Sequence, residues 1–432
     1  MFRLLDSGSK ALNTSIPTFC HYSHAQLSQK IAPSRQVSCG AASFVTNASS
    51  SQAPQVAIVG GGISGLMCAR ILQQNGHRAI VFERDASRDS RTQGGLLDMH
   101  VESGQWALQQ AGLFDHFQAL IHEGTQDIRV MDHRGTVHWE EEGPPGTEGR
   151  PEIDRPALRA MLLDALQPET IKWGHHLVAI EPRPPHGHTL RFADGASMTA
   201  DVVVGADGAR SRVRPLVTNV SPSYCGACYF DMRIPDADRM HPEVTSVVGR
   251  GSFMALGDSK GIMAQRLGDG SIYAWAACRM SEDRFTQLQL DKAWESAAAS
   301  KQAVGAMFEG WPPECLRLIH ACDHTMKSRS FAALPVGLTW QSRSDVTLLG
   351  DSAHLSSPFA GEGANLALQD GADFALELLK AADPAEAIAA YEARMFSRAE
   401  AAAVESAQGL EMCLAPDGAE RLAQFMRSAH EL

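Results

Sequence analysis

Three glycines that follow a short apolar run place the strongest constraint on how this chain folds. The run Val56-Ala-Ile-Val59 leads into Gly60, Gly62 and Gly65, which have the spacing GxGxxG, and apolar residues then recur at helical spacing. In such a unit the first glycine permits a tight turn, the second lets the main chain approach a pyrophosphate, and the third lets the helix pack closely on the strand. Free N–H groups at the start of the helix favour bound phosphates. The segment therefore predicts a dinucleotide-binding βαβ unit.

The second strand of this unit supports the same interpretation. The helical pattern stops at Asn75-Gly76, a typical helix end, and a second apolar run over 79–82 is followed by Glu83. An acid at this place, about twenty residues after the glycines, can accept hydrogen bonds from ribose hydroxyls. The motif alone does not distinguish NAD from FAD.

Two later segments also place an acid and a glycine after an apolar run. The first, 201–205, leads into the turn Asp207-Gly208. Such a turn after a strand is common, so a purely structural role stays open. The second, 346–349, leads to Asp351 at the expected carboxyl edge of a sheet, where ligands bind in doubly wound folds.

The loop after this second run has the residues of a segment that approaches a ligand with its backbone. Pro358 keeps the preceding residue out of a helix, Gly361 and Gly363 relax the backbone, and a helical pattern begins near Asn365. We expect a second free helix N-terminus here, beside an acid that can bind a polyol hydroxyl.

These three motifs, in this order, resemble those of the FAD-dependent aromatic hydroxylases, the class A flavoprotein monooxygenases. The resemblance covers about residues 55–412. It implies an α/β fold: a Rossmann-like FAD-binding domain of the glutathione-reductase type, an inserted antiparallel-sheet substrate domain and a long C-terminal helix. It also implies that NADPH or NADH reduces FAD, and that the reduced flavin reacts with O2 to give a C4a-hydroperoxide. That species would hydroxylate a small aromatic or polyketide-like molecule.

Segments 91–100, 151–159 and 357–365 are most similar to the flavin-dependent tetracycline-inactivating monooxygenases. This resemblance implies that Glu83 and Arg84 hold the AMP part of FAD, that Arg91 meets NADPH and that Pro358 lies near the flavin ring. We interpret His100 as a packed structural histidine. The residues expected to bind cofactors are Gly60, Gly62, Gly65, Glu83, Arg84, Arg91, Asp98, Arg155, Asp207, Gly208, Asp351, Pro358, Gly361, Gly363 and Asn365.

The expected substrate contacts lie on short strands with period-two patterns. Tetracycline-handling relatives place a Gln, an Arg and a His on this sheet, whereas this chain has Asp231, Ser252 and Tyr273 there. That polar set is not reproduced, so whether tetracyclines are accepted stays open. Trp275 shares a face with Tyr273 and completes the predicted substrate set.

The same patterns divide the chain. Short strands between about 222 and 330 predict an antiparallel sheet, residues 291–310 predict a helix, and the pattern from Ile388 onward predicts a long amphipathic helix that braces two domains. The expected parts are an extension at 1–52, a discontinuous FAD-binding domain at 53–221 and 331–383, a substrate-binding domain at 222–330, and a helical segment at 384–432.

Charge and composition exclude several classes of partner. The net charge of −12 disfavours nucleic acid as a partner. No apolar run reaches the ~18–20 residues of a membrane helix, so no integral membrane contact is expected.

The nine cysteines lack regular spacing, and the pair Cys225 and Cys228 is either buried structure or a redox or zinc site. No protein catalytic cluster is evident, and we expect a monomer with a small-molecule substrate.

Residues 1–52 are rich in Ser, Ala and Gln and contain a single acid, Asp6. They indicate either an extension without a targeting signal, in a cytoplasmic protein, or a mitochondrial transit peptide.

Three functions are consistent with these patterns. The first is the monooxygenase, the second is a flavin-dependent dehydrogenase or reductase without oxygen insertion, and the third is a flavin-binding scaffold without activity. The third requires damaged motifs, and the sequence shows none.

Overall fold

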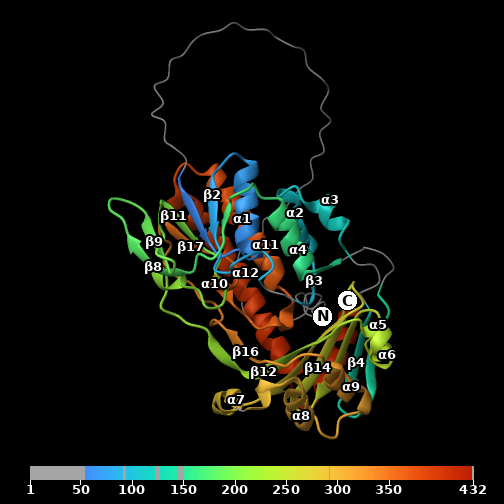
Figure 1. Ribbon diagram of the computed structural model, residues 1–432. Helices are drawn as coiled ribbons and strands as arrows, with labels where there is room; N and C mark the ends of the chain where they lie inside the picture. The colour runs from blue at the N-terminus through green and yellow to red at the C-terminus, as the bar shows by residue number, and fades with distance from the viewer. Residues whose placement is uncertain (1–53, 91–93, 122–126, 144–149, 291, 431–432) are drawn as a thin grey trace, which may run out of the picture.

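The computed structural model describes residues 54–90, 94–121, 127–143, 150–290 and 292–430. Its first part is built on a five-stranded parallel sheet, drawn in the upper half of Figure 1. The strands are β1 (Val56–Val59), β2 (Ala79–Phe82), β7 (Ile171–Lys172), β11 (Val202–Gly205) and β17 (Val346–Leu348). Their order, β17-β11-β1-β2-β7, places the late strand β17 next to β11.

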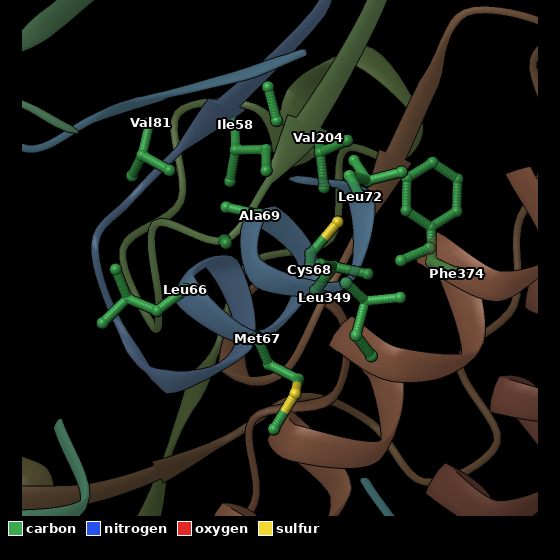
Figure 2. Packing of buried hydrophobic residues seen from close by; sticks show 14 of the residues in the cluster. Ile58, Leu66, Met67, Cys68, Ala69, Leu72, Val81, Val204, Leu349 and Phe374 are labelled. Carbon is green, nitrogen blue, oxygen red and sulfur yellow. The ribbon is translucent and has the colours of Figure 1, made fainter. Parts of the chain in front are cut away.

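Two helices cover this sheet at the first glycine motif. They are α1 (Ile63–Gln74) and α11 (Gly363–Lys380). Strands β1, β11 and β17 are buried along their whole length, as is usual for parallel strands with both faces covered. Figure 2 shows Ile58 and Val204 of the strands in one cluster with Leu72 of α1 and Phe374 of α11.

Helices α1 and α11 touch through their backbones. A Cβ atom at Gly371 would lie 2.4 Å from the carbonyl oxygen of Ser64, and one at Gly350 would lie 3.3 Å from Ser64 Oγ. Glycine at these positions therefore lets the N-terminal halves of both helices lie side by side. This contact brings together two loops that are far apart in the sequence.

Smaller elements complete this part. A ribbon pairs β3 (Leu96–Asp98) with β6 (Glu152–Asp154), and β8 (Leu177–Pro182), β9 (His188–Phe192) and β10 (Ser197–Ala200) form a separate antiparallel sheet. The helical elements are the π-helical turn η2 (Val101–Gln105), α2 (Trp106–Gln110), α3 (Phe114–Gln118), α4 (Arg155–Asp164), the 3-10 turns η3 (Arg214–Leu216) and η5 (Pro358–Ala360), and α10 (Asp351–His354).

The second part is a seven-stranded sheet in the lower half of Figure 1. Its order, β16-β12-β15-β14-β13-β4-β5, is antiparallel except between β13 and β4. The strands are β4 (Ile128–Asp132), β5 (Val137–Glu141), β12 (Ser223–Ile234), β13 (Ser252–Gly257), β14 (Lys260–Arg266), β15 (Ile272–Arg279) and β16 (Ser328–Ala333).

Strands β4 and β5 lie inside the segment 53–221, which the sequence assigned to the FAD-binding domain, yet they extend the seven-stranded sheet. An alternating pattern specifies a half-buried strand but does not specify its partner. The boundary predicted at residue 221 therefore does not separate the two sheets, because these two strands precede it in the sequence.

The helices on one face of the seven-stranded sheet bury large aromatic residues. Phe230, Phe253 and Phe308 are fully buried there. The helices of this region are α5 (Ala237–Met240), α6 (Pro242–Val248), α7 (Glu282–Gln289), the 3-10 turn η4 (Lys292–Glu295), α8 (Ala297–Met307) and α9 (Pro313–Ala321). The single helix expected over 291–310 is interrupted at Ser296, because its Oγ caps α8 by accepting a hydrogen bond from Ala299 N at 3.2 Å.

The C-terminal helices connect the two parts. They are α12 (Pro384–Cys413) and α13 (Gly418–His430). Ile388 and Tyr391, near the start of α12, belong to the core of the parallel sheet, whereas Leu410, near its end, packs on the seven-stranded sheet. The predicted bracing helix is thus present, and Figure 1 shows it running from one sheet to the other.

The predicted fold class is confirmed: a parallel α/β sheet, an inserted antiparallel sheet and a long C-terminal helix. In the described part of the chain, no helix has both the length and the apolar character needed to cross a membrane.

The backbone contact between α1 and α11 generates a stability prediction. We expect Gly371→Ala to lower the free energy of unfolding by ~1–3 kcal/mol, because the new methyl group would meet Ser64 O at 2.4 Å. Gly363→Ala, in the first turn of the same helix, is the control, since its Cβ would meet nothing within 4 Å. Denaturant unfolding of FAD-free protein measures both. Equal effects of the two variants would contradict the packing argument.

Candidate active site

The glycine loop between β1 and α1 contains two kinds of glycine. Gly60 has φ +113°, and a Cβ there would lie 2.1 Å from the carbonyl oxygen of Ala206. A Cβ at Gly65 would lie 2.3 Å from Gly60 O. Gly62, the N-cap of α1, has φ −80°, and its nearest neighbour would be Ala206 O at 4.0 Å. Packing therefore explains Gly60 and Gly65, while the space beside Gly62 is open for a ligand at the helix N-terminus.

Glu83 lies at the end of β2, directly below this loop. Its buried carboxylate accepts hydrogen bonds from Gly61 N at 2.7 Å and Asp85 N at 2.9 Å. Arg84 is exposed. The guanidinium of Arg159 in α4 donates to Gly61 O at 3.3 Å, a contact that the sequence did not reveal. The only indication of Arg159 in the sequence was that it follows Arg155 by four residues, so that both lie on one face of the helix.

The Asp207–Gly208 turn and the Gly350–Asp351 turn are bonded to each other. Arg214 is buried, and its guanidinium donates to Ser352 O at 2.7 Å, Asp351 O at 3.1 Å and Ala209 O at 3.0 Å. Gly208 N also donates to Ser352 Oγ at 3.3 Å. Sequence reasoning missed Arg214, because the alternating arginines of 210–214 do not show which one points inward.

The two acids of these turns differ. Asp207 accepts hydrogen bonds from Ser211 Oγ at 2.5 Å and Arg212 N at 2.6 Å, so its carboxylate closes its own turn. Burial raises the pKa of Asp207, and these hydrogen bonds oppose the rise. Asp351 is exposed at the first residue of α10. Only Asp351 therefore presents a carboxylate outward from the joined turns.

A buried acid at the end of the second turn of α11 holds the loop 350–363 against α12. Asp370 accepts hydrogen bonds from Gly350 N at 2.8 Å, His354 Nε2 at 2.6 Å and Arg398 at 3.0 Å. Burial raises the pKa of Asp370, but the charges of His354 and Arg398 outweigh it and lower the pKa overall. The loop is thus fixed by a carboxylate that stays ionised.

A pair of serines makes a second anchor for the same loop. Ser357 Oγ lies 2.7 Å from Ser406 Oγ, and Ser406 Oγ donates to Ser357 O at 2.6 Å. Both side chains are buried. Pro358 follows directly, so α12 fixes the backbone just before η5.

The start of α11 repeats the arrangement at Gly62. Gly361 has φ +79°, which requires glycine, whereas Gly363 is helical and a Cβ there would meet nothing within 4 Å. No packing contact in the described part of the chain explains Gly363. Two helix N-termini, at α1 and α11, therefore each carry a glycine with open space in front of it.

Asn365 ties the first turn of α11 to the segment after β3. Its side chain donates to Asp98 O at 2.9 Å and accepts from His100 N at 2.9 Å. The amide is fully buried, so any contribution of Asn365 to a ligand comes through its backbone.

His100 lies between two carboxylates beneath the α11 N-terminus. Its Nε2 donates to Asp98 Oδ2 at 3.1 Å, and its Nδ1 lies 3.0 Å from Glu362 Oε1. Burial lowers the pKa of His100, but both carboxylates raise it, to about 9 overall. The histidine is packed, as the sequence suggested, and it carries a charge that the sequence did not suggest.

Two predicted arginines remain. Arg91 lies outside the described residues. Arg155 is the first residue of α4, its backbone N donates to Gly95 O at 3.2 Å, and its charge lowers the pKa of the nearby phenols of Tyr229 and Tyr273, whose pKa values burial raises. Arg155 therefore lies near the seven-stranded sheet.

The four predicted substrate residues share one face of that sheet. Asp231 of β12 lies opposite Trp275 of β15. Tyr273 of β15 lies opposite Gln265 of β14, which in turn lies opposite Ser252 of β13. Paired residues of neighbouring strands point to the same side. Gln265 was missed, although its strand was predicted, because period two alone does not separate a functional face from a core face.

The paired cysteines do not form a metal site. Within the described ranges, the one cluster of three metal-ligating side chains is Asp132, His138 and Glu420, which contains neither Cys225 nor Cys228. Burial raises the pKa of the Cys228 thiol to about 12, so it stays protonated.

This fold, with two glycine-bearing helix N-termini beside one exposed acid, is typical of a dinucleotide-binding protein. Residues 53–226 and 319–406 match the family described as FAD binding domain. The match covers more than half of the chain, and the protein belongs to that family.

Similar curated proteins are monooxygenases. Monooxygenase asqM of Emericella nidulans is 29% identical over 372 residues, which covers 75% of this chain and 83% of that protein. The 6-hydroxynicotinate 3-monooxygenase of Pseudomonas fluorescens is 29% identical over 366 residues, which covers 81% of this chain and 89% of that protein. The protein is therefore an FAD-dependent monooxygenase of small molecules, as the sequence predicted.

Solved structures share the fold. HpxO of Klebsiella pneumoniae, complexed with FAD and uric acid, superposes with a TM-score of 0.71 at 20% identity and covers 88% of this chain and 93% of its own. The tetracycline destructase Tet(55) superposes with a TM-score of 0.69 at 19% identity and covers 88% of this chain and 96% of its own.

The open space at Gly363 generates a binding prediction. We expect Gly363→Val to weaken FAD binding by at least tenfold, because a side chain there would occupy the approach to the α11 N-terminus without disturbing any packing contact. FAD titration of FAD-free protein, followed by flavin fluorescence, measures this. Gly305→Val in α8 is the matched control. Unchanged FAD affinity and an unchanged flavin spectrum in Gly363→Val would refute the assignment.

The charged His100 generates a prediction about pH. The raised pKa means that its contribution to stability is fully present below pH 6.5 and is lost as the pH rises through about 9. We expect the melting temperature of FAD-free protein to fall over this range, and His100→Gln to remove that part of the fall. His188→Gln, equally buried but in β9, serves as the control. A pH profile that His100→Gln leaves unaltered would contradict the ion pairs.

Proposed function

We propose that this monooxygenase uses NADPH or NADH and O2 to hydroxylate a small aromatic or polyketide-like molecule. The observation that carries the proposal is the aromatic face of the seven-stranded sheet, which meets the loop before α11. Phe359 of η5 lies 5.3 Å from Phe331, measured between ring centroids, and Phe331 in turn neighbours Tyr229 at 4.8 Å. The proposed flavin loop and the proposed substrate wall are therefore in contact.

FAD fits the residues around the two helix N-termini. We infer that Gly60 and Gly65 shape the loop that brings the main chain at Gly62 to the pyrophosphate, that Glu83 and Arg84 hold the AMP part, and that Asp351 accepts a hydrogen bond from the ribityl chain. The spaces in front of Gly62 and Gly363 support this inference, because a Cβ atom would fill both and no packing contact of the described residues requires glycine there. Arg91, Asp98, Arg155, Asp207, Gly208, Pro358, Gly361 and Asn365 complete the proposed set.

The flavin supplies the electron transfer and the oxygen activation when it is bound. The protein's own tasks are then positional. Backbone N–H groups at the start of α11 would hold the flavin by hydrogen bonds, and the His100–Glu362 pair fixes the turn that presents them. The wall of Tyr229, Trp275 and Phe331 excludes water from the reacting face.

The names of two similar proteins support an aromatic substrate. The relative from Pseudomonas fluorescens acts on 6-hydroxynicotinate, and one from Streptomyces platensis acts on 3-amino-4-hydroxybenzoate. We infer a substrate of that kind for this enzyme. The monomeric state, the cytoplasmic location and the choice between NADPH and NADH stay predictions.

The decisive experiment measures NADPH and NADH consumption by FAD-loaded protein over a panel of small aromatic compounds, with mass detection of products. We expect at least one compound to accelerate consumption and to yield a product with one additional oxygen atom. Reduced nicotinamide consumed over the whole panel without such a product would instead favour a flavin-dependent reductase. FAD-free wild-type protein gives the background rate.

A further inference from the structure

One acid on the substrate wall has a buried oxygen that receives no hydrogen bond from the described residues, although it forms an ion pair with Arg329. Asp231 Oδ1 is buried and receives no hydrogen bond from the described residues. The nearest cation is Arg329, whose Nε lies 3.6 Å away, beyond hydrogen-bond distance. Leaving a buried carboxylate oxygen unpaired costs roughly 1–3 kcal/mol or more. The position therefore suits a ligand that donates a hydrogen bond.

The cross-strand neighbours of Asp231 are aromatic. Trp275 is its direct partner on β15, and Tyr273 stands two residues before Trp275, with ring centroids 6.2 Å apart. Tyr229 stands two residues before Asp231 on the same face, 5.3 Å from Trp275. These side chains are only partly buried. The carboxylate is thus set in a wall that would stack against a flat ring.

The FAD-binding part contacts the substrate wall on both sides of Asp231. On one side, a Cβ at Gly94 would lie 3.0 Å from the Tyr273 ring. On the other side, Phe331 meets Phe359, which directly follows Pro358 of the proposed flavin loop. Asp231 therefore lies between the two places where the FAD-binding part touches this face. A molecule held there would lie close to the flavin.

We propose that Asp231 selects substrates that carry a hydrogen-bond donor on an aromatic ring, a phenolic O–H or a ring-attached N–H. An ionised carboxylate only accepts hydrogen bonds, so a methylated oxygen or nitrogen cannot satisfy it. The hydrogen bond to a charged acceptor fixes which edge of the ring faces the sheet. This inference rests on the proposed aromatic hydroxylation and adds its specificity-determining residue.

Matched pairs of ring compounds test the inference. A phenol and its methyl ether, and an aniline and its N,N-dimethyl derivative, differ in the donor and little in shape. Binding to FAD-loaded protein is followed by the change in flavin absorbance, which does not require turnover. We expect the wild-type protein to bind the donor member roughly 10- to 100-fold more tightly than the methylated member.

Asp231→Asn should reduce this preference to about threefold or less, with FAD content unchanged and the melting temperature not lowered, because the amide keeps the shape and loses the charge. Asp258→Asn is the control: it makes the same substitution at an exposed turn of the same sheet, where the side chain pairs with Lys260 at 2.7 Å. Arg329→Gln removes the nearest competing cation. It should therefore sharpen the preference.

The outcomes separate this inference from the proposed function. An unchanged preference in Asp231→Asn, or a preference that collapses in Arg329→Gln, would overturn the role of Asp231 while leaving the monooxygenase intact. A wild-type protein that binds both members of every pair equally would do the same. A flavin spectrum that responds to no ring compound would overturn the aromatic substrate class itself.

Discussion

The candidate site depends on how closely α11 approaches α1. The carbonyl oxygen of Ser64 occupies the place of a side chain at Gly371, so the two helices can lie together only because that residue is glycine. The first turn of α1 consequently packs on the middle of α11, and the N-terminus of each helix offers free N–H groups and a positive partial charge. One long cofactor can then bind at both helix N-termini, although the segment between the two helices contains all strands of the seven-stranded sheet.

Charged side chains are buried in this region where they fix a loop. Arg214 binds carbonyl oxygens of both acidic turns, and Asp370 binds a backbone N–H together with two cationic side chains. His100 bridges Asp98 and Glu362. Burying an ion costs several kcal/mol unless it is paired and hydrogen-bonded. Asp370 and His100 are paired with opposite charges, and Arg214 is hydrogen-bonded to three carbonyl oxygens. Their burial therefore holds the glycine-rich loops in fixed positions.

The sequence predicted the parts of the structure that depend on local chemistry. The glycine spacing, the helix end at Asn75 and the strands of the inserted sheet follow from backbone sterics and from alternation, which neighbouring residues determine. It did not predict the pairing of β4 with β13 or the inward orientation of Arg214, because both depend on residues more than a hundred positions away. His100 was read as packed, but its charge follows from Glu362, which no local pattern connects to it.

The same division explains why the sequence indicates the cofactor while it does not indicate the substrate. The loops at Gly62 and Gly363 meet a cofactor through their backbones, so their geometry constrains the residue types and leaves a readable motif. The substrate wall meets its ligand through side chains on a rigid sheet, where Asp231 or Gln265 can change without altering the backbone. Substrate choice can therefore diverge while the flavin site stays constant. The Asp231 oxygen that receives no hydrogen bond then constrains the proposed substrate more than the surrounding fold does.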